Sequence, residues 1–149
     1  MPSKRKSGFS MDAAKALLRS VSLRCTAARI AVVQTLANHQ TPLSPTEVAD
    51  ELAEFGFDKS TIYRSLTELG EAGIVARLDL GDAVRRFELL PQGAEGKSEH
   101  PHFMCIDCGK VICLSGFQID LVPKDKSQKP PGQLDEVLVK GHCNACLKA

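Results

Sequence analysis

The fold of the first half of the chain is decided by residues 60–90, which read STIYRSLTELGEAGIVARLDLGDAVRRFELL. Within residues 60–73, three apolar side chains recur on one helical face and a glycine ends the run: Ile62, Leu66, Leu69 and Gly73. Residues 74–80 instead alternate roughly in twos, Gly81-Asp82 supplies a turn, and residues 84–90 can return as a second strand. The stretch therefore predicts a helix followed by a β-hairpin.

Three further helices are predicted upstream, where apolar residues also recur at helical spacing. Each run follows a residue that caps helices well: Ser10, Thr26 and Ser44. Ser44 opens a capping box with proline at the first helical position, and Gly56 is expected to end that helix. The helix after Thr26 is expected to bury Ile30, Val33 and Ala37. The helix after Ser44 is expected to bury Val48, Leu52 and Phe55. Helices followed by a hairpin are the outline of a winged helix-turn-helix, whose last helix can enter the major groove of DNA.

Composition sets the broad class of the protein. The 149 residues are 43% hydrophobic and 25% charged, which is ordinary globular usage and excludes wholesale disorder. No apolar run approaches the ~18 residues of a membrane helix, and the N-terminus lacks the apolar stretch of a signal peptide, so we expect a cytoplasmic protein with no membrane partner. Residues 1–30 hold seven Lys and Arg against Asp12. This basic arm is either a contact surface for phosphates or a solvated tail.

The second half begins after a polar, glycine-rich stretch at residues 91–100, which reads as a hinge. Strands are expected near residues 102–106, 110–114 and 137–142, with a surface loop over residues 123–133. His100 and His102 frame a proline at the start of the first of these strands. On a strand, residues i and i+2 point to the same face, so both imidazoles can bind one ion.

Two Cys-x-x-Cys knuckles carry the most specific chemical pattern: Cys105, Cys108, Cys143 and Cys146. Together they supply four thiolates, the number that tetrahedral zinc requires, and a closed four-sulfur shell leaves no position for a substrate. The pattern indicates a structural zinc site. A pair of disulfides and a dithiol redox site are the alternatives, disfavoured by the expected reducing compartment and by the lack of a βαβ pattern around either knuckle.

Four stretches, in order along residues 12–146, resemble the motifs of the ferric uptake regulator family. They are RCTAAR at residues 24–29, STIYRSL at 60–66, HPHFMCIDCGKVI at 100–112 and GHCNAC at 141–146. The first resembles the start of the family's second helix, and the second its recognition helix. The other two resemble its metal-binding signature and its closing knuckle.

The resemblance implies a homodimeric, metal-responsive transcriptional repressor that controls metal homeostasis and is most like a zinc uptake regulator. Its α+β fold would comprise an N-terminal winged helix-turn-helix domain at residues 1–90, with a basic arm at 1–10, then the hinge at 91–100. Residues 101–149 would form a small C-terminal α/β dimerisation domain with the four-cysteine zinc site. The partner would be a double-stranded DNA operator, typically an AT-rich inverted repeat.

The resemblance also implies roles for individual residues. The structural zinc ligands would be Cys105, Cys108, Cys143 and Cys146. The ligands of a regulatory metal at the hinge would be Glu88, His100, His102 and Cys113. The DNA-contacting residues would be Arg24, Arg29, Ser60, Thr61, Tyr63 and Arg64; a tyrosine ring can touch thymine methyl groups, and arginine can bind guanine or phosphate.

The chain departs from the family pattern at four places. Pro42 stands where many relatives carry a ligand histidine, and His39 could substitute only if the loop bent back. Cys113 stands where a carboxylate is common, although a lone cysteine is most often a small buried hydrophobe. A third metal site would fall on residues that include no histidine: Glu99, Asp120 and Asp135. The helix usual after the second strand is replaced by a segment containing Pro123, Pro130 and Pro131.

The expected regulatory ligands comprise one carboxylate oxygen, two imidazole nitrogens and one thiolate. Four ligands including a thiolate suit tetrahedral zinc better than manganese, which prefers oxygen-rich octahedral shells. We therefore expect a zinc-responsive regulator, with an iron-, manganese- or peroxide-responsive regulator as the alternative. A thiol oxidoreductase or zinc hydrolase is disfavoured, because no nucleophile and base pair up near the histidines. A purely structural zinc-ribbon module is disfavoured by the recognition-helix residues and the basic arm.

Overall fold

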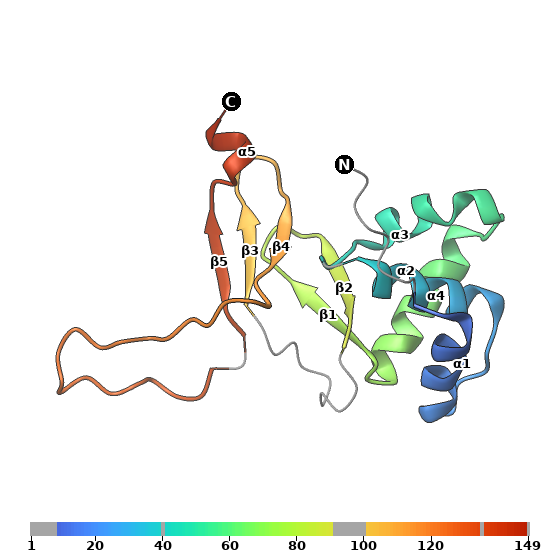
Figure 1. Cartoon of the computed structure of the whole chain (residues 1–149), viewed down its shortest axis with the longest axis horizontal. Helices are drawn as coiled ribbons and strands as arrows, with labels where there is room; N and C mark the ends of the chain where they lie inside the picture. Colours follow the sequence, from blue (N-terminus) through green and yellow to red (C-terminus); the bar gives the residue numbers. More distant parts are fainter. Residues whose placement is uncertain (1–8, 40, 91–100, 135, 149) are drawn as a thin grey trace. The chain divides into compact units, whose positions relative to one another are not determined.

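The computed structural model describes residues 9–39, 41–90, 101–134 and 136–148 (Figure 1). The chain divides into two compact units, Met1–Gly96 and Lys97–Ala149, and each unit is described by itself. Most of the basic arm (residues 1–8) and the whole hinge stretch (residues 91–100) lie outside the described residues. The domain boundaries expected at residues 90 and 101 stay predictions.

The first unit contains four α-helices followed by a two-stranded sheet (Figure 1). The helices are α1 (Met11–Ser20), α2 (Ala27–Asn38), α3 (Pro45–Glu51) and α4 (Lys59–Glu71). The three predicted caps are confirmed, since the side chains of Ser10, Thr26 and Ser44 accept backbone N–H groups at the starts of α1, α2 and α3. Ile62, Leu66 and Leu69 of α4 are all fully buried, as their spacing predicts.

The end of α3 differs from the prediction. The α-helix stops at Glu51, and a short 3-10 helix, η1 (Ala53–Phe55), carries the chain to Gly56. The left-handed backbone of Gly56, with φ of 76°, ends the segment as expected. The tighter helix rotates Phe55 out of the apolar stripe. Val48 and Leu52 are buried, but Phe55 is 64% exposed, so its expected place in the core is wrong.

Helix α2 is buried on more than the single face that the sequence predicts. Ile30 and Val33 are buried and Ala37 is half-buried, but the buried set extends around the helix to Ala28, Val32, Thr35 and Leu36. The reason is its central position, because α1, α3, α4 and the second strand all pack against α2. Thr35 is tolerated there because its hydroxyl donates to the carbonyl of Ala31 at 2.8 Å.

The hairpin that follows α4 consists of β1 (Val75–Asp79) and β2 (Arg85–Leu89). The strands are antiparallel, with Val75 opposite Leu89 and Asp79 opposite Arg85. Arg86 on β2 is buried and donates two hydrogen bonds to Asp82 in the turn, at 3.1 and 2.8 Å. The hydrogen bond from the Arg86 guanidinium holds the pKa of Asp82 below its usual value. The predicted helix and hairpin are therefore confirmed.

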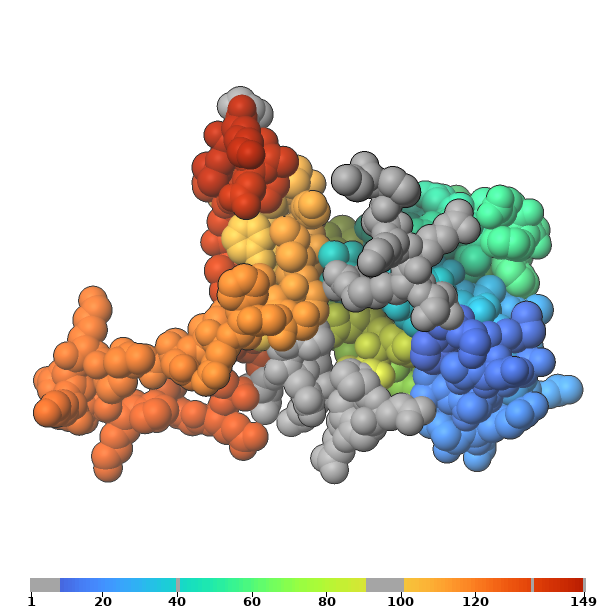
Figure 2. Space-filling model, in the orientation of Figure 1, coloured from blue at the N-terminus to red at the C-terminus, as the bar shows by residue number. Residues whose placement is uncertain are grey.

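The second unit is a three-stranded sheet closed by a short helix. Its elements are β3 (His102–Cys105), β4 (Val111–Cys113), β5 (Leu138–Gly141) and α5 (Asn144–Leu147). Strand β3 is central, antiparallel to β4 and parallel to β5. The segment between β4 and β5 contains no helix among its described residues, and it protrudes from the strands of its own unit (Figure 2, orange). Four of its apolar side chains are exposed: Phe117, Leu121, Val122 and Leu134.

The predicted α+β fold class is confirmed, with helices and a hairpin in the first unit and a small mixed sheet in the second. In the described part of the chain, no helix has both the length and the apolar character needed to cross a bilayer.

Candidate functional site

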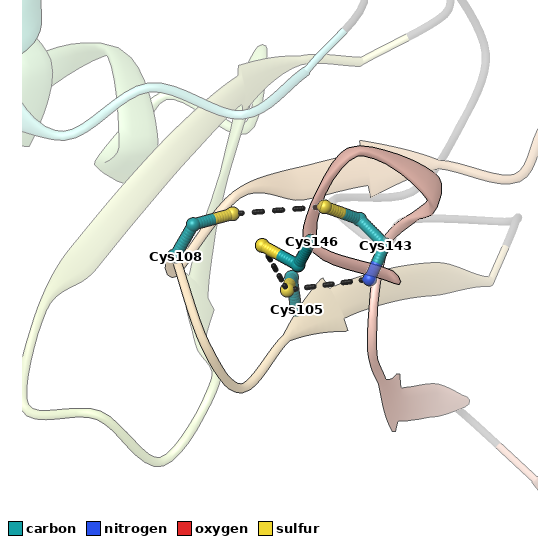
Figure 3. Close-up of side chains that lie close together, drawn as sticks. All are labelled: Cys105, Cys108, Cys143 and Cys146. Carbon is teal, nitrogen blue, oxygen red and sulfur yellow. Dashed lines mark hydrogen bonds between the residues drawn. The ribbon is translucent and has the colours of Figure 1, made fainter. Parts of the chain in front are cut away.

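The four knuckle cysteines form a cluster in the second unit (Figure 3). Cys105 ends β3, Cys108 lies in the turn that follows, Cys143 caps α5, and Cys146 lies within it. All four sulfur atoms lie within 4.8 Å of one another. The sulfurs of Cys105 and Cys146 are 3.8 Å apart, as are those of Cys108 and Cys143. Both distances far exceed the ~2.05 Å of a disulfide bond.

The cluster has the dimensions of a four-sulfur zinc site. Tetrahedral zinc with Zn–S bonds of about 2.3 Å places its sulfurs about 3.8 Å apart, and the two sulfur pairs above have that separation. Thiolates are soft ligands, and they favour zinc over harder cations such as magnesium or calcium, which prefer oxygen ligands. The residues present therefore fit zinc, and a filled shell of this kind would hold the fold together without offering a position to a substrate.

Strand pairing explains how knuckles far apart in the sequence meet. The parallel register of β3 and β5 sets Cys105 opposite Gly141, two residues before Cys143. Beyond the strands, the N–H of Ile106 donates to the carbonyl of Gly141 at 2.9 Å, which extends the alignment into the first knuckle. Gly109, with φ of 73°, lets the chain turn back after Cys108. The sheet therefore assembles the cluster, and the two knuckles contribute two sulfurs each.

Backbone N–H groups prepare one of these sulfurs for metal binding. Cys105 is buried, and the N–H of Cys143 donates to its sulfur at 3.3 Å. Hydrogen bonds from the backbone of Cys108 and then of Cys143 lower the pKa of Cys105 to about 6. Because the thiolate is the form that binds metal, these hydrogen bonds favour the metal-binding form of Cys105.

An ion pair beside the cluster was not predicted from the sequence. Nδ1 of His142 lies 2.5 Å from a carboxylate oxygen of Asp107, and both side chains are about half exposed. The hydrogen bond to Asp107 raises the pKa of His142. The pair links one knuckle to the other. No sequence pattern predicts it, because Asp107 and His142 become neighbours only through the β3–β5 register.

Two of the four expected regulatory ligands face each other across the same sheet. His102 on β3 is fully buried and lies directly opposite Cys113 on β4. Their ligand atoms are within 4.8 Å of each other. His100 lies outside the described residues, and Glu88 lies on β2 of the first unit. The complete set of four ligands stays a prediction.

The other residues considered as metal ligands are His39 and those of the expected third metal site, and the described ones are exposed or already paired. Nε2 of His39 lies 2.5 Å from a carboxylate oxygen of Glu51, within the first unit. This contact gives His39 a partner that is not a metal. Asp120 is exposed and accepts hydrogen bonds from the side chain of Gln118. Glu99 and Asp135, the other residues of the expected third site, lie outside the described residues.

The start of α4 carries four of the six expected DNA contacts, and three of these four are exposed. Asp58 caps the helix, and the Ser60 hydroxyl donates to it at 2.5 Å. Ser60 and Arg64 are exposed, Thr61 is half-buried, and Tyr63 is 42% exposed. The Tyr63 hydroxyl lies 3.4 Å from that of Thr46 on α3. The structure therefore brings these four side chains together on one helix, as their spacing predicts.

The two expected contacts near α2 differ from each other. Arg24 is exposed in the loop before α2, whereas Arg29 is half-buried and forms an ion pair with Glu68 of α4 at 2.6 Å. Between these two arginines, Cys25 donates a hydrogen bond from its sulfur to the carbonyl of Lys15, at 3.7 Å, and packs against the core. The guanidinium of Arg29 is thus already bound within the protein.

Known proteins share both the sequence pattern and the fold. The model of the ferric uptake regulator family matches residues 20–139. The ferric uptake regulation protein of Campylobacter jejuni is 30% identical over an alignment of 139 residues, and the match covers 87% of this chain and 85% of that protein.

Two solved structures show the same fold. The crystal structure of the Vibrio cholerae ferric uptake regulator has a TM-score of 0.65 at 24% identity, over 87% of this chain and 98% of that one. A zinc uptake regulator in complex with zinc and DNA has a TM-score of 0.54 at 19% identity, over 93% of each chain. The family model spans most of the chain, and the chain therefore belongs to the ferric uptake regulator family.

Proposed function

We propose that the protein is a metal-dependent, DNA-binding transcriptional repressor that acts as a homodimer, controls metal homeostasis and responds to zinc. Family membership supports the regulatory role, since the relatives are regulators of metal uptake. The first unit would bind an AT-rich inverted repeat through α4 and the basic arm. The second unit would form the dimer and hold a structural zinc ion on Cys105, Cys108, Cys143 and Cys146.

The choice of regulatory metal rests on one observation, the position of Cys113 directly opposite His102 in the sheet. His102 offers a buried imidazole, a ligand of intermediate softness, and Cys113 beside it offers a sulfur, which is soft as a thiolate. Such a pair suits zinc better than manganese, which prefers oxygen. With Glu88 and His100 as the other ligands, the regulatory site would have four ligands and tetrahedral geometry.

The proposed ligands come from both sides of the hinge at residues 91–100. Glu88 belongs to the wing, whereas His100 and His102 follow the hinge. A bound ion supplies bonds to both sides at once. The angle and separation of the two α4 helices in the dimer are then fixed, and they must match half-sites about one helical turn apart. A shift from mostly open to mostly closed arrangements needs about 5.5 kcal/mol of differential metal affinity.

Iron is the second candidate for the regulatory metal. It is favoured by the relatives, of which the Campylobacter jejuni protein is named a ferric uptake regulation protein. In that case Cys113 would be a small hydrophobic residue of the sheet and would not bind metal.

A DNA-binding titration of the Cys113→Ser variant separates the two metals. We expect wild-type protein, already holding its structural zinc, to bind operator DNA when zinc is added, with little response to Fe(II) or Mn(II). Cys113→Ser should need at least about tenfold more zinc, because a thiolate ligand is lost. Cys25→Ser, a cysteine in the first unit, is the matched control and should respond as wild type. A Cys113→Ser protein with normal zinc response and a wild type that responds to Fe(II) would establish the iron-responsive alternative.

A further inference from the structure

The guanidinium of Arg29 joins three parts of the first unit. Arg29 lies in the first turn of α2, and Glu68 lies in the last turn of α4. Nε and Nη2 of Arg29 donate to the same oxygen of Glu68, at 3.0 and 2.6 Å. Nη1 donates to the backbone carbonyl of Arg24, at 3.0 Å. The side chain therefore connects α2, the loop before it, and α4.

Each charge in this pair lies at the unfavourable end of its own helix. A cation is disfavoured near the N-terminus of α2, and an anion is disfavoured near the C-terminus of α4, because both oppose the helix dipole. The pairing offsets both effects. The side chains of Arg29 and Glu68 are only 17% and 31% exposed, so water screens their attraction incompletely. Each charge is therefore stabilised by the other helix.

The pair also determines the charge on the face of α4 that carries Arg64. Glu68 follows Arg64 by four residues, which places the two side chains on the same face, one turn apart. Without Arg29, the carboxylate of Glu68 would be an uncompensated negative charge on this face. It would repel DNA phosphates and would also attract the guanidinium of Arg64.

We propose that Arg29 is a positioning residue that acts through Glu68, in place of the DNA contact that the sequence resemblance implies. Arg29 neutralises Glu68 and ties the last turn of α4 to α2, which leaves Arg64 available for DNA. This inference rests on the proposed function, since it concerns the helix that we assign to DNA recognition.

The test compares Arg29→Gln, Glu68→Gln and the double variant with wild type. The probe is the DNA duplex that metal-loaded wild-type protein selects most tightly from a random pool, and the readouts are the dissociation constant and its salt dependence. We expect Arg29→Gln to bind at least about tenfold more weakly, and the double variant to recover to within about threefold of wild type, because neutral glutamines remove the exposed carboxylate. Glu68→Gln alone should bind no more tightly than wild type. The salt slope of the double variant should equal that of wild type.

A direct phosphate contact by Arg29 predicts the opposite pattern. Glu68→Gln would then release the guanidinium and tighten binding. Arg29→Gln and the double variant would be equally weak, each with a salt slope reduced by about one. That pattern, in a wild type that binds DNA, would overturn this inference alone. A wild-type protein that selects no duplex with any metal would overturn the proposed function, and the inference with it.

Discussion

The two units of the chain are stabilised by different means. In the first unit, seventeen buried residues from the four helices, the hairpin and the segments that join them form one continuous apolar core. In the second unit, only five of the described residues are buried: His102, Met104, Cys105, Val111 and Cys143. Two of those five are cysteines of the four-sulfur cluster. The first unit is therefore stabilised by apolar packing, whereas the second has too little buried apolar surface to be stable without further bonds.

Loss of the cluster should produce the largest effect in the molecule. We expect Cys143→Ser, or removal of metal by a strong chelator, to unfold the second unit, because structural zinc can supply about 10 kcal/mol of folding free energy. The first unit should keep its helices. Calorimetry would measure the unfolding transitions, circular dichroism the helix content, and elemental analysis the bound zinc.

Cys25→Ser is the control for that experiment, since Cys25 belongs to the first unit and lies outside the cluster. It should retain both the metal and both unfolding transitions. A Cys143→Ser protein that contains no zinc and yet unfolds like wild type would show that the second unit does not need the metal.

An intermediate effect is expected when the apolar core of the first unit is weakened. Leu66 is fully buried in α4, so Leu66→Ala should lower the free energy of unfolding of this unit by about 2–5 kcal/mol. The zinc content and the unfolding transition of the second unit should not change. Phe55→Ala is the matched control, because Phe55 is 64% exposed and its loss should change stability little. Equal losses in the two variants would contradict the placement of Phe55.

The smallest effect concerns pH and the turn of the hairpin. The folded state holds the pKa of Asp82 below its usual value through Arg86. The resulting stability is therefore present above the unfolded pKa of about 3.9 and is lost as the pH falls through the folded value. Asp82→Asn should lower the stability of the first unit by about 1 kcal/mol at neutral pH, measured by denaturant titration, and the difference from wild type should vanish in acid. Asp125→Asn, on the second unit, is the control. A difference that persists at low pH would mean that Asp82 does not act through its charge.

Local patterns predicted the elements of the fold well. The helix starts follow from Ser10, Thr26 and Ser44, whose side chains satisfy the N–H groups next to them in sequence. The position of Phe55 could not be predicted in the same way. The change from α-helix to 3-10 helix after Glu51 depends on packing by distant residues, and it alters which side chains share a face.

In the candidate site too, some features follow from residues close together in the sequence, and others depend on residues far apart. The four cysteines could be found from the sequence, because two Cys-x-x-Cys pairs in one chain are a common spacing for zinc ligands. The partners of Arg29 and His142 could not, since each pair forms only when elements 39 and 35 residues apart meet. Glu68 and Asp107 are common surface residue types, so nothing in the sequence marks them as partners.

The pairing of β3 with both neighbours has a consequence for the long segment that protrudes from the second unit. Cys113 at the end of β4 and Leu138 at the start of β5 both pair with His102. The segment between them therefore leaves and re-enters the sheet at the same end, over a span of roughly 10 Å across two strand spacings. Closing such a loop costs only about 0.6 kcal/mol more when its length doubles. The four cysteines lie toward the opposite end of β3, so insertions or deletions in this segment can change the outer surface of the protein while the cluster stays intact.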